Sequence, residues 1–195
     1  MLTVRKILAA DNLKRNNTKT ILYFLLASVF FLFIPFILLL LRNINISSNF
    51  RYPAALTIST MVLIGASILL RVSMTAKQKD NYLQFRTLIT ASLTLGLIFV
   101  FIQVHSFIVM YPELKALSSN IISIIILVHA AHFLVAVLLL TKLAISAIRF
   151  RSGADLYIFF LDIKNERLLY VTKIFWDYLG YLWIGLYLIM LLKTI

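Results

Sequence analysis

Five polar side chains lie inside long apolar stretches of the sequence: Gln103, His105, His129, His132 and Asp177. His129 and His132 are three residues apart, so on a helix their imidazoles would share one face. Imidazoles can ligate haem or a metal, or they can form a polar pair with a carboxylate. The chemistry of this chain therefore depends on what these few groups meet within the apolar surroundings.

Three interpretations of the histidines are open. The first is a polar pair that fixes the register of packed helices. The second is haem ligation, which needs histidines on two helices at matching depth, and His105 lies roughly 9–13 Å in depth from His129 and His132. The third is a dimetal site, whose ferritin-like form needs several glutamates, yet no Glu lies within an apolar stretch.

Composition places the chain in a membrane. Of its 195 residues 62% are apolar and only 13% are charged, whereas about 25% would be charged in a soluble domain. The mean hydropathy is +0.98. No cysteine is present, which excludes disulfides, thiolate metal sites and cysteine nucleophiles. The net charge of +12 collects in short hydrophilic segments, a pattern typical of membrane topology signals, so we expect no nucleic-acid partner.

A helix that crosses a membrane needs about 20 mostly apolar residues. Five runs qualify and predict an all-α integral membrane bundle of five transmembrane helices. They cover about 20–41, 54–72, 88–111, 117–148 and 168–192. A basic tail at 1–19 precedes them, and no linker is long enough for a second domain. The whole chain, 1–195, is therefore expected to form a single membrane domain.

The basic residues predict the topology. Fifteen of the 19 Lys and Arg residues fall in the N-terminal tail or around the second and fourth links, and only Arg42, Arg51, Lys115 and Lys193 fall on the other side. Because basic residues favour the cytoplasmic side, the N-terminus is predicted in the cytoplasm and the C-terminus outside.

Depth counting suggests a partner for Asp177. His129 and His132 lie roughly 18–22 Å below the outer end of their run, and Asp177 lies roughly 14 Å above the inner end of the last run. In a core about 30 Å thick these depths are comparable. A carboxylate inside a membrane needs a partner, so we predict that Asp177 pairs with His132 or His129.

The segment 149–170 differs from the other links. It has two apolar arms around a polar centre, a pattern that fits either a short β-hairpin or an interfacial helix. Such a segment would serve as an anchor on the lipid surface or as a docking element for a partner.

Four short motifs, in order along successive runs, resemble subunit III of the haem-copper oxidases. They fall where the family has N-T-x-x-L, L-G-x-x-F-x-x-x-Q, H-G-x-H and H-F-x-D. In this chain they read Thr60-Met61-Val62-Leu63, Leu95-Gly96-Leu97-Ile98-Phe99-Val100-Phe101-Ile102-Gln103, His129-Ala130-Ala131-His132 and Phe175-Trp176-Asp177. Family members often have seven helices, so this chain resembles a short form without the first two. It departs from the family at Ala27 and Ser106, where the family has glutamates, at Ile174, where it has a histidine, and at Ala136, where it has a glycine.

The resemblance implies an accessory subunit of an aerobic respiratory terminal oxidase in a bacterial cytoplasmic membrane. Such a subunit has no catalytic, cofactor-binding or metal-binding residue of its own. It packs against subunit I, beside subunit II, and holds membrane lipids, while haem and copper belong to the partner subunits. Gln103, His129, His132 and Asp177 carry over as structural intramembrane positions.

Two alternatives to this function remain. A small haem-b membrane cytochrome would take electrons from quinol, and the related accessory subunit of a nitric oxide reductase would share the fold. The electron donor of the oxidase, cytochrome c or quinol, and membership of a larger respiratory supercomplex are left open by the sequence.

Overall fold

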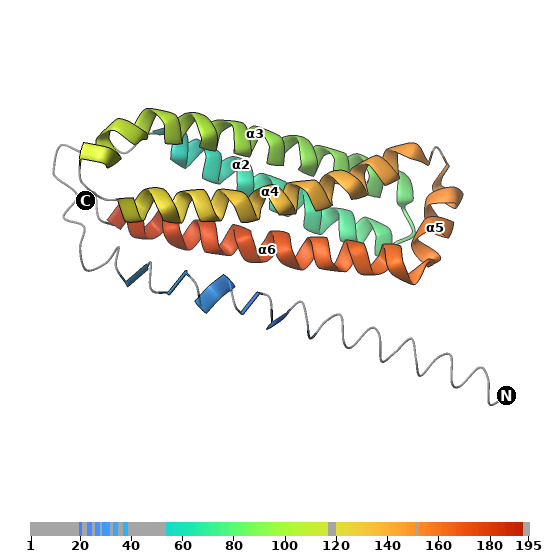
Figure 1. Ribbon diagram of the computed structural model, residues 1–195. Helices are drawn as coiled ribbons and strands as arrows, with labels where there is room; N and C mark the ends of the chain where they lie inside the picture. Colours follow the sequence, from blue (N-terminus) through green and yellow to red (C-terminus); the bar gives the residue numbers. More distant parts are fainter. Residues whose placement is uncertain are drawn as a thin grey trace.

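The computed structural model describes residues 54–116, 120–150 and 152–192, together with scattered positions between 20 and 38 (Figure 1). Throughout these described residues the chain forms helices and no strand, which confirms the all-α prediction. The helices are α2 (Ala54–Gln78), α3 (Tyr82–Ala116), α4 (Asn120–Arg149), α5 (Gly153–Leu161) and α6 (Ile163–Leu192).

Within the described residues, three helices are long and apolar enough to cross a membrane. They are α2 over its full length, Ala54–Gln78, and the stretches Tyr82–Val109 of α3 and Leu127–Arg149 of α4. Their length and composition identify the chain as a membrane protein. The described positions of the predicted first span, 20–41, are all helical, but the bounds of that span and the basic tail lie outside the described residues.

Among the four fully described long helices, α2, α3, α4 and α6, each packs against two of the others. α2 contacts α3 and α6, and α4 contacts the same two helices from the opposite side (Figure 1). Short links join α2 to α3 and α4 through α5 to α6 at one end of the bundle, so consecutive long helices are antiparallel. The first of these links turns at Asp80, whose φ of 55° lies in the left-handed region. Asn81 then caps α3 by accepting a hydrogen bond from the Gln84 backbone N–H at 3.1 Å.

Helix ends lie farther into the polar segments than hydropathy predicted. α2 continues to Gln78 instead of 72, α3 begins at Tyr82 instead of 88, and α6 begins at Ile163 instead of 168. A hydropathy run stops at the first charges, but helices do not, because long basic side chains can extend away from the apolar surface. As a result Arg71 lies about two turns inside α2 and not at its end.

An aromatic cluster joins three helices at the centre of the bundle. Phe99 of α3 and Phe133 of α4 have ring centroids 4.7 Å apart. Phe133 is 5.1 Å from Trp176 of α6, and Phe99 is 5.9 Å from Trp183, about two turns farther along that helix. Trp176 is fully buried. His129 of α4 joins this cluster by stacking on Trp183.

The segment after α4 forms the short helix α5, so the predicted β-hairpin is wrong and the helical alternative is right. Ser152 caps α5 by accepting a hydrogen bond from the Asp155 N–H at 3.0 Å. Its buried residues are Leu156 and Phe160, and the Phe160 ring meets Phe85 of α3 edge-on at 5.3 Å. The first apolar arm therefore forms α5, and the second arm lies in the first turns of α6.

Candidate functional site

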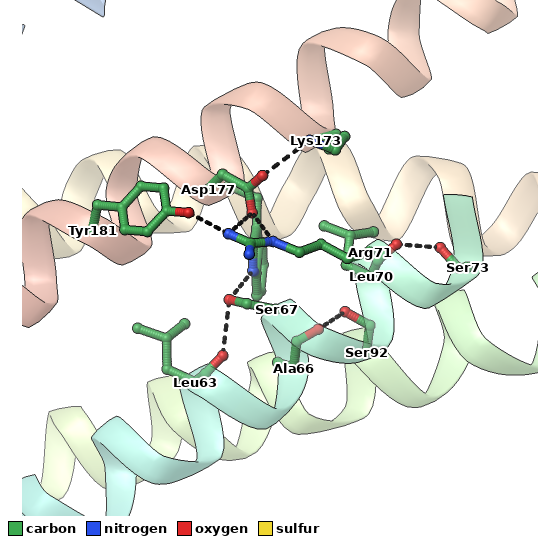
Figure 2. Close-up of polar contacts among 11 residues, drawn as sticks. Leu63, Ala66, Ser67, Leu70, Arg71, Ser73, Ser92, Lys173, Asp177 and Tyr181 are labelled. Atoms are coloured by element: carbon green, nitrogen blue, oxygen red, sulfur yellow. Dashed lines mark hydrogen bonds and ion pairs between the residues drawn. The ribbon is translucent and has the colours of Figure 1, made fainter. Parts of the chain in front are cut away.

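Gln103 links two helices. Its side-chain N–H donates a hydrogen bond to the Ser59 hydroxyl of α2 at 3.0 Å, and Ser59 in turn donates to the Leu56 carbonyl at 2.8 Å. Lower in the same interface, the Ser92 hydroxyl of α3 donates to the Ala66 carbonyl of α2 at 2.8 Å (Figure 2). Both contacts join α2 to α3. Gln103 of α3 therefore has a polar partner, Ser59, on the neighbouring helix.

His132 is satisfied within its own helix. Its Nδ1 atom lies 2.7 Å from the Val128 carbonyl oxygen, one turn earlier in α4. The side chain is half-buried. His132 therefore makes no polar contact with another helix among the described residues.

His129 is placed differently. It is 3% exposed, and neither ring nitrogen has a hydrogen-bond partner in the described part of the chain. Its ring stacks on the Trp183 indole of α6, with centroids 5.4 Å apart and planes inclined by 27°. The Phe33 ring meets it edge-on at 6.1 Å. The imidazole thus packs as an aromatic ring while both of its nitrogens remain unpaired.

The predicted pairing of Asp177 with a histidine is wrong. One carboxylate oxygen of Asp177 lies 3.4 Å from the Arg71 guanidinium of α2, and the other lies 3.1 Å from Lys173 Nζ (Figure 2). The Arg71 guanidinium also donates to the Tyr181 hydroxyl. Asp177 is only 14% exposed, so both cations neutralise a carboxylate that is largely removed from solvent.

Depth explains the error. His129 packs against Trp183, which lies six residues beyond Asp177 on α6, or about 9 Å along the helix axis. The predicted depths were counted from opposite ends and compared within a core of about 30 Å. Because α4 and α6 each have 30 residues, or about 45 Å, two different levels looked equal. Lys173, four residues before Asp177, was a local signal in the sequence, because residues at that spacing meet on a helix.

Sequence reasoning missed a row of contacts along the α2–α6 interface, which we call the α2–α6 seam. Besides Arg71 and Asp177, three hydrogen bonds of 3.1 Å make up this seam. They are Trp183 Nε1 to the Thr60 hydroxyl, Trp176 Nε1 to the Ser67 hydroxyl, and the bond between the Thr57 and Tyr187 hydroxyls.

A cavity of about 350 Å³ opens between α3 and α4. Its walls are mainly aromatic and aliphatic, and the polar side chains that line it besides the indole of Trp183 are Gln103 and His129. His105 is exposed on α3 and does not line this cavity. The structure therefore brings Gln103 and His129 to one place, and it leaves His132 and Asp177 elsewhere.

The described residues contain no group of three or more His, Cys, Asp or Glu side chains that could together hold a metal ion. No model of a known protein family matches this chain, and no curated protein matches it either. The polar groups must therefore be interpreted from their own geometry.

Proposed function

We propose that the chain is a non-catalytic accessory subunit of an aerobic respiratory haem-copper oxidase, the function that its motifs resemble. It stabilises the catalytic subunit I, beside subunit II, in a bacterial cytoplasmic membrane. The haem and copper of the complex belong to those partner subunits. The mechanism is packing: the chain presents a rigid, preassembled bundle to the catalytic subunit.

One observation carries the proposal. Two of the family-like motifs contribute residues that hold helices together. Thr60 accepts the Trp183 indole N–H, Gly96 makes room for the Trp176 ring, and Gln103 bonds to Ser59. In a scaffolding subunit we expect motif residues to join helices in this way.

The topology is part of the proposal. Five spans, with the N-terminus in the cytoplasm and the C-terminus outside, would place the α2–α3 turn and α5 on the cytoplasmic side. These lie at the same end of the bundle (Figure 1). Lysines and arginines are concentrated at this end, in Lys77, Lys79, Arg86, Arg149, Lys164 and Arg167. The positive-inside rule supports this orientation.

Large apolar side chains cover the outside of the bundle. Met61 of α2, Phe101 of α3 and Leu138 of α4 are each at least 60% exposed. In the proposed assembly, one such face meets subunit I and the others meet lipid. Lipid tails are as apolar as these side chains, so the exposed residues can face either lipid or an apolar surface of subunit I.

Copurification tests the function. The full chain, carrying an affinity tag, is isolated from aerobically grown cells in mild detergent, and its partners are identified by mass spectrometry. We expect haem-copper subunits in stoichiometric amount, and a tagged multi-pass protein of unrelated function serves as the control. Isolation with nitric oxide reductase subunits, or a Soret band from the chain alone, would replace the proposal with one of the alternatives.

Single arginine substitutions then map the docking face. Met61→Arg, Phe101→Arg and Leu138→Arg each place a charge on a different exposed face. We expect one of them to release the oxidase subunits while the other two retain them. If all three retain the oxidase, the proposed packing mechanism fails.

A further inference from the structure

The cavity between α3 and α4 has the features of a ligand site. A volume of about 350 Å³ lies at the lower end of the range for small-molecule pockets. Phe99 and Phe133 lie on its walls, together with Trp183. Such sites are typically apolar, with a few polar groups that orient the ligand, and here Gln103 and His129 supply those groups.

The unpaired nitrogens of His129 indicate a ligand independently of the shape of the cavity. It is 3% exposed, and both ring nitrogens lack a partner among the described residues, although a buried polar group is normally hydrogen-bonded. A neutral imidazole has one N–H donor and one acceptor nitrogen. A water in the cavity would meet few polar side chains, whereas buried waters typically make about three hydrogen bonds. A ligand that carries its own oxygen atom fits the imidazole better.

The position of the opening restricts the ligand to membrane-soluble molecules. Ala130 and Ala131, on the exposed side of α4, line the cavity, and their small side chains leave its mouth open toward the outside of the bundle. The apolar, uncharged part of α4 is residues 121–141, about 30 Å long, and His129 lies eight residues, or about 12 Å, from its first residue. Half of a hydrocarbon core is about 15 Å, so the imidazole lies near the bilayer centre.

Depth and wall chemistry separate two kinds of ligand. Phospholipid ester oxygens lie at the membrane interface, too far from this depth to reach His129, and an acyl chain has no oxygen to offer. A flat ring that carries carbonyl or hydroxyl oxygens satisfies the imidazole and also packs against the surrounding aromatic side chains. We propose that this cavity binds the head group of a membrane quinone or quinol, with a ring oxygen hydrogen-bonded to His129 and Gln103 beside it.

This inference concerns binding alone and is independent of the proposed oxidase function. Gln103 keeps its contact with Ser59, because its carboxamide oxygen is still available to accept a hydrogen bond from a quinol hydroxyl. The stack of His129 on Trp183 places an indole next to the site, and this indole serves as a reporter.

Tryptophan fluorescence provides the test, because the chain has only two tryptophans, Trp176 and Trp183. The full chain in phosphatidylcholine vesicles is titrated with decylubiquinone, a benzoquinone with a ten-carbon tail. We expect quenching that saturates at one quinone per chain. Decylbenzene, which has the tail and a ring without oxygens, should not displace the quinone.

Two cavity variants and a matched control complete the design. His129→Leu should weaken the saturable binding by about threefold to tenfold, the effect of one lost hydrogen bond. Ala131→Phe should abolish the saturable component by filling the mouth of the cavity. Leu138→Phe, which changes an exposed residue of α4 outside the cavity, should leave it unchanged.

Three results would overturn the proposal. One is quenching that rises without saturation to the same extent in the wild type, Ala131→Phe and Leu138→Phe. Another is displacement of the quinone by decylbenzene at equal concentration, which would show a site for hydrocarbon chains. The third is unchanged affinity in His129→Leu. Because Ala131 lies on the exposed side of α4, its variant remains informative even if His129→Leu fails to fold.

Discussion

Trp176 of α6 lies against the backbone of α3 at Gly96, and a Cβ atom at position 96 would be 2.7 Å from the indole Cη2 atom. Real side chains do not approach so closely, so the indole requires glycine here. The same indole is fully buried and donates its N–H to Ser67 of α2 at 3.1 Å. One residue pair thus sets the spacing of three helices.

Gly96→Ala is expected to lower the stability of the bundle. The methyl group forces Trp176 to move, and overpacking of this kind costs about 1–3 kcal/mol. Thermal unfolding of the purified chain in detergent, followed by circular dichroism, measures the loss. Gly185→Ala on α6 is the control, because a Cβ there meets nothing within 4 Å. It should keep or slightly raise the melting temperature, and equal losses in the two variants would contradict the spacing role of Gly96.

Asp177→Asn is expected to cost about 1–3 kcal/mol, because charge-assisted hydrogen bonds to a largely buried carboxylate are lost. The upper values expected for fully buried pairs do not apply, since Arg71 is 49% exposed and screened. The double variant with Arg71→Gln should lose less than the sum of the single variants. Chemical denaturation in mixed micelles gives the three free energies of unfolding.

Glu166→Gln is the contrasting control for that pair. Glu166 lies 3.8 Å from Lys77 but is 67% exposed, so its loss should cost less than about 0.5 kcal/mol. If Glu166→Gln destabilises as much as Asp177→Asn, burial does not determine the importance of these ion pairs.

Thr60→Val is expected to destabilise by about 1–3 kcal/mol. The substitution keeps the shape of the side chain but leaves the buried Trp183 indole N–H without an acceptor. Thr75→Val on the same helix is the matched control, because the Thr75 hydroxyl is exposed and bonds only within α2. In thermal unfolding scans, the melting temperature of Thr60→Val should be several degrees below that of Thr75→Val. Equal melting temperatures would show that Thr60 does not stabilise the α2–α6 seam.

The sequence predicted the helical class and the approximate location of α2, α3, α4 and α6, because long runs of consecutive apolar residues indicate membrane helices. It also predicted that Asp177 needs a partner. It could not identify that partner, because the rotation of one helix against another depends on side-chain packing across the whole interface. Asp177 illustrates this limit: depth counting allowed a histidine, whereas the actual rotation of α2 brings Arg71 to it.

The cavity was also beyond sequence reasoning. His129 and Gln103 are distant in the chain and belong to two separate motifs, and nothing in either motif indicates that they line one space. The small residues Ala130 and Ala131, between the two histidines of that motif, lie on the exposed side of α4. Small side chains therefore open the bundle here instead of tightening it.

Phe160→Ala tests whether α5 is held to the bundle by its buried face. Phe160 is 5% exposed, meets Phe85 at 5.3 Å, and has Lys77 Nζ 4.7 Å from its ring centroid. Removing a buried phenyl ring of this kind costs about 3 kcal/mol, which exceeds what a nine-residue helix gains from its own hydrogen bonds. We therefore expect α5 to detach while the four long helices remain folded.

Limited trypsin digestion in detergent measures this detachment. Cleavage after Arg149 or Lys164, on either side of α5, should become several times faster in Phe160→Ala than in the wild type. Ile158→Ala is the control, because Ile158 is 63% exposed on the same helix and contributes little to docking. Faster cleavage in both variants would mean that helix propensity, not the Phe160 contact, maintains α5. No change in either would mean that Leu156 alone suffices to hold it.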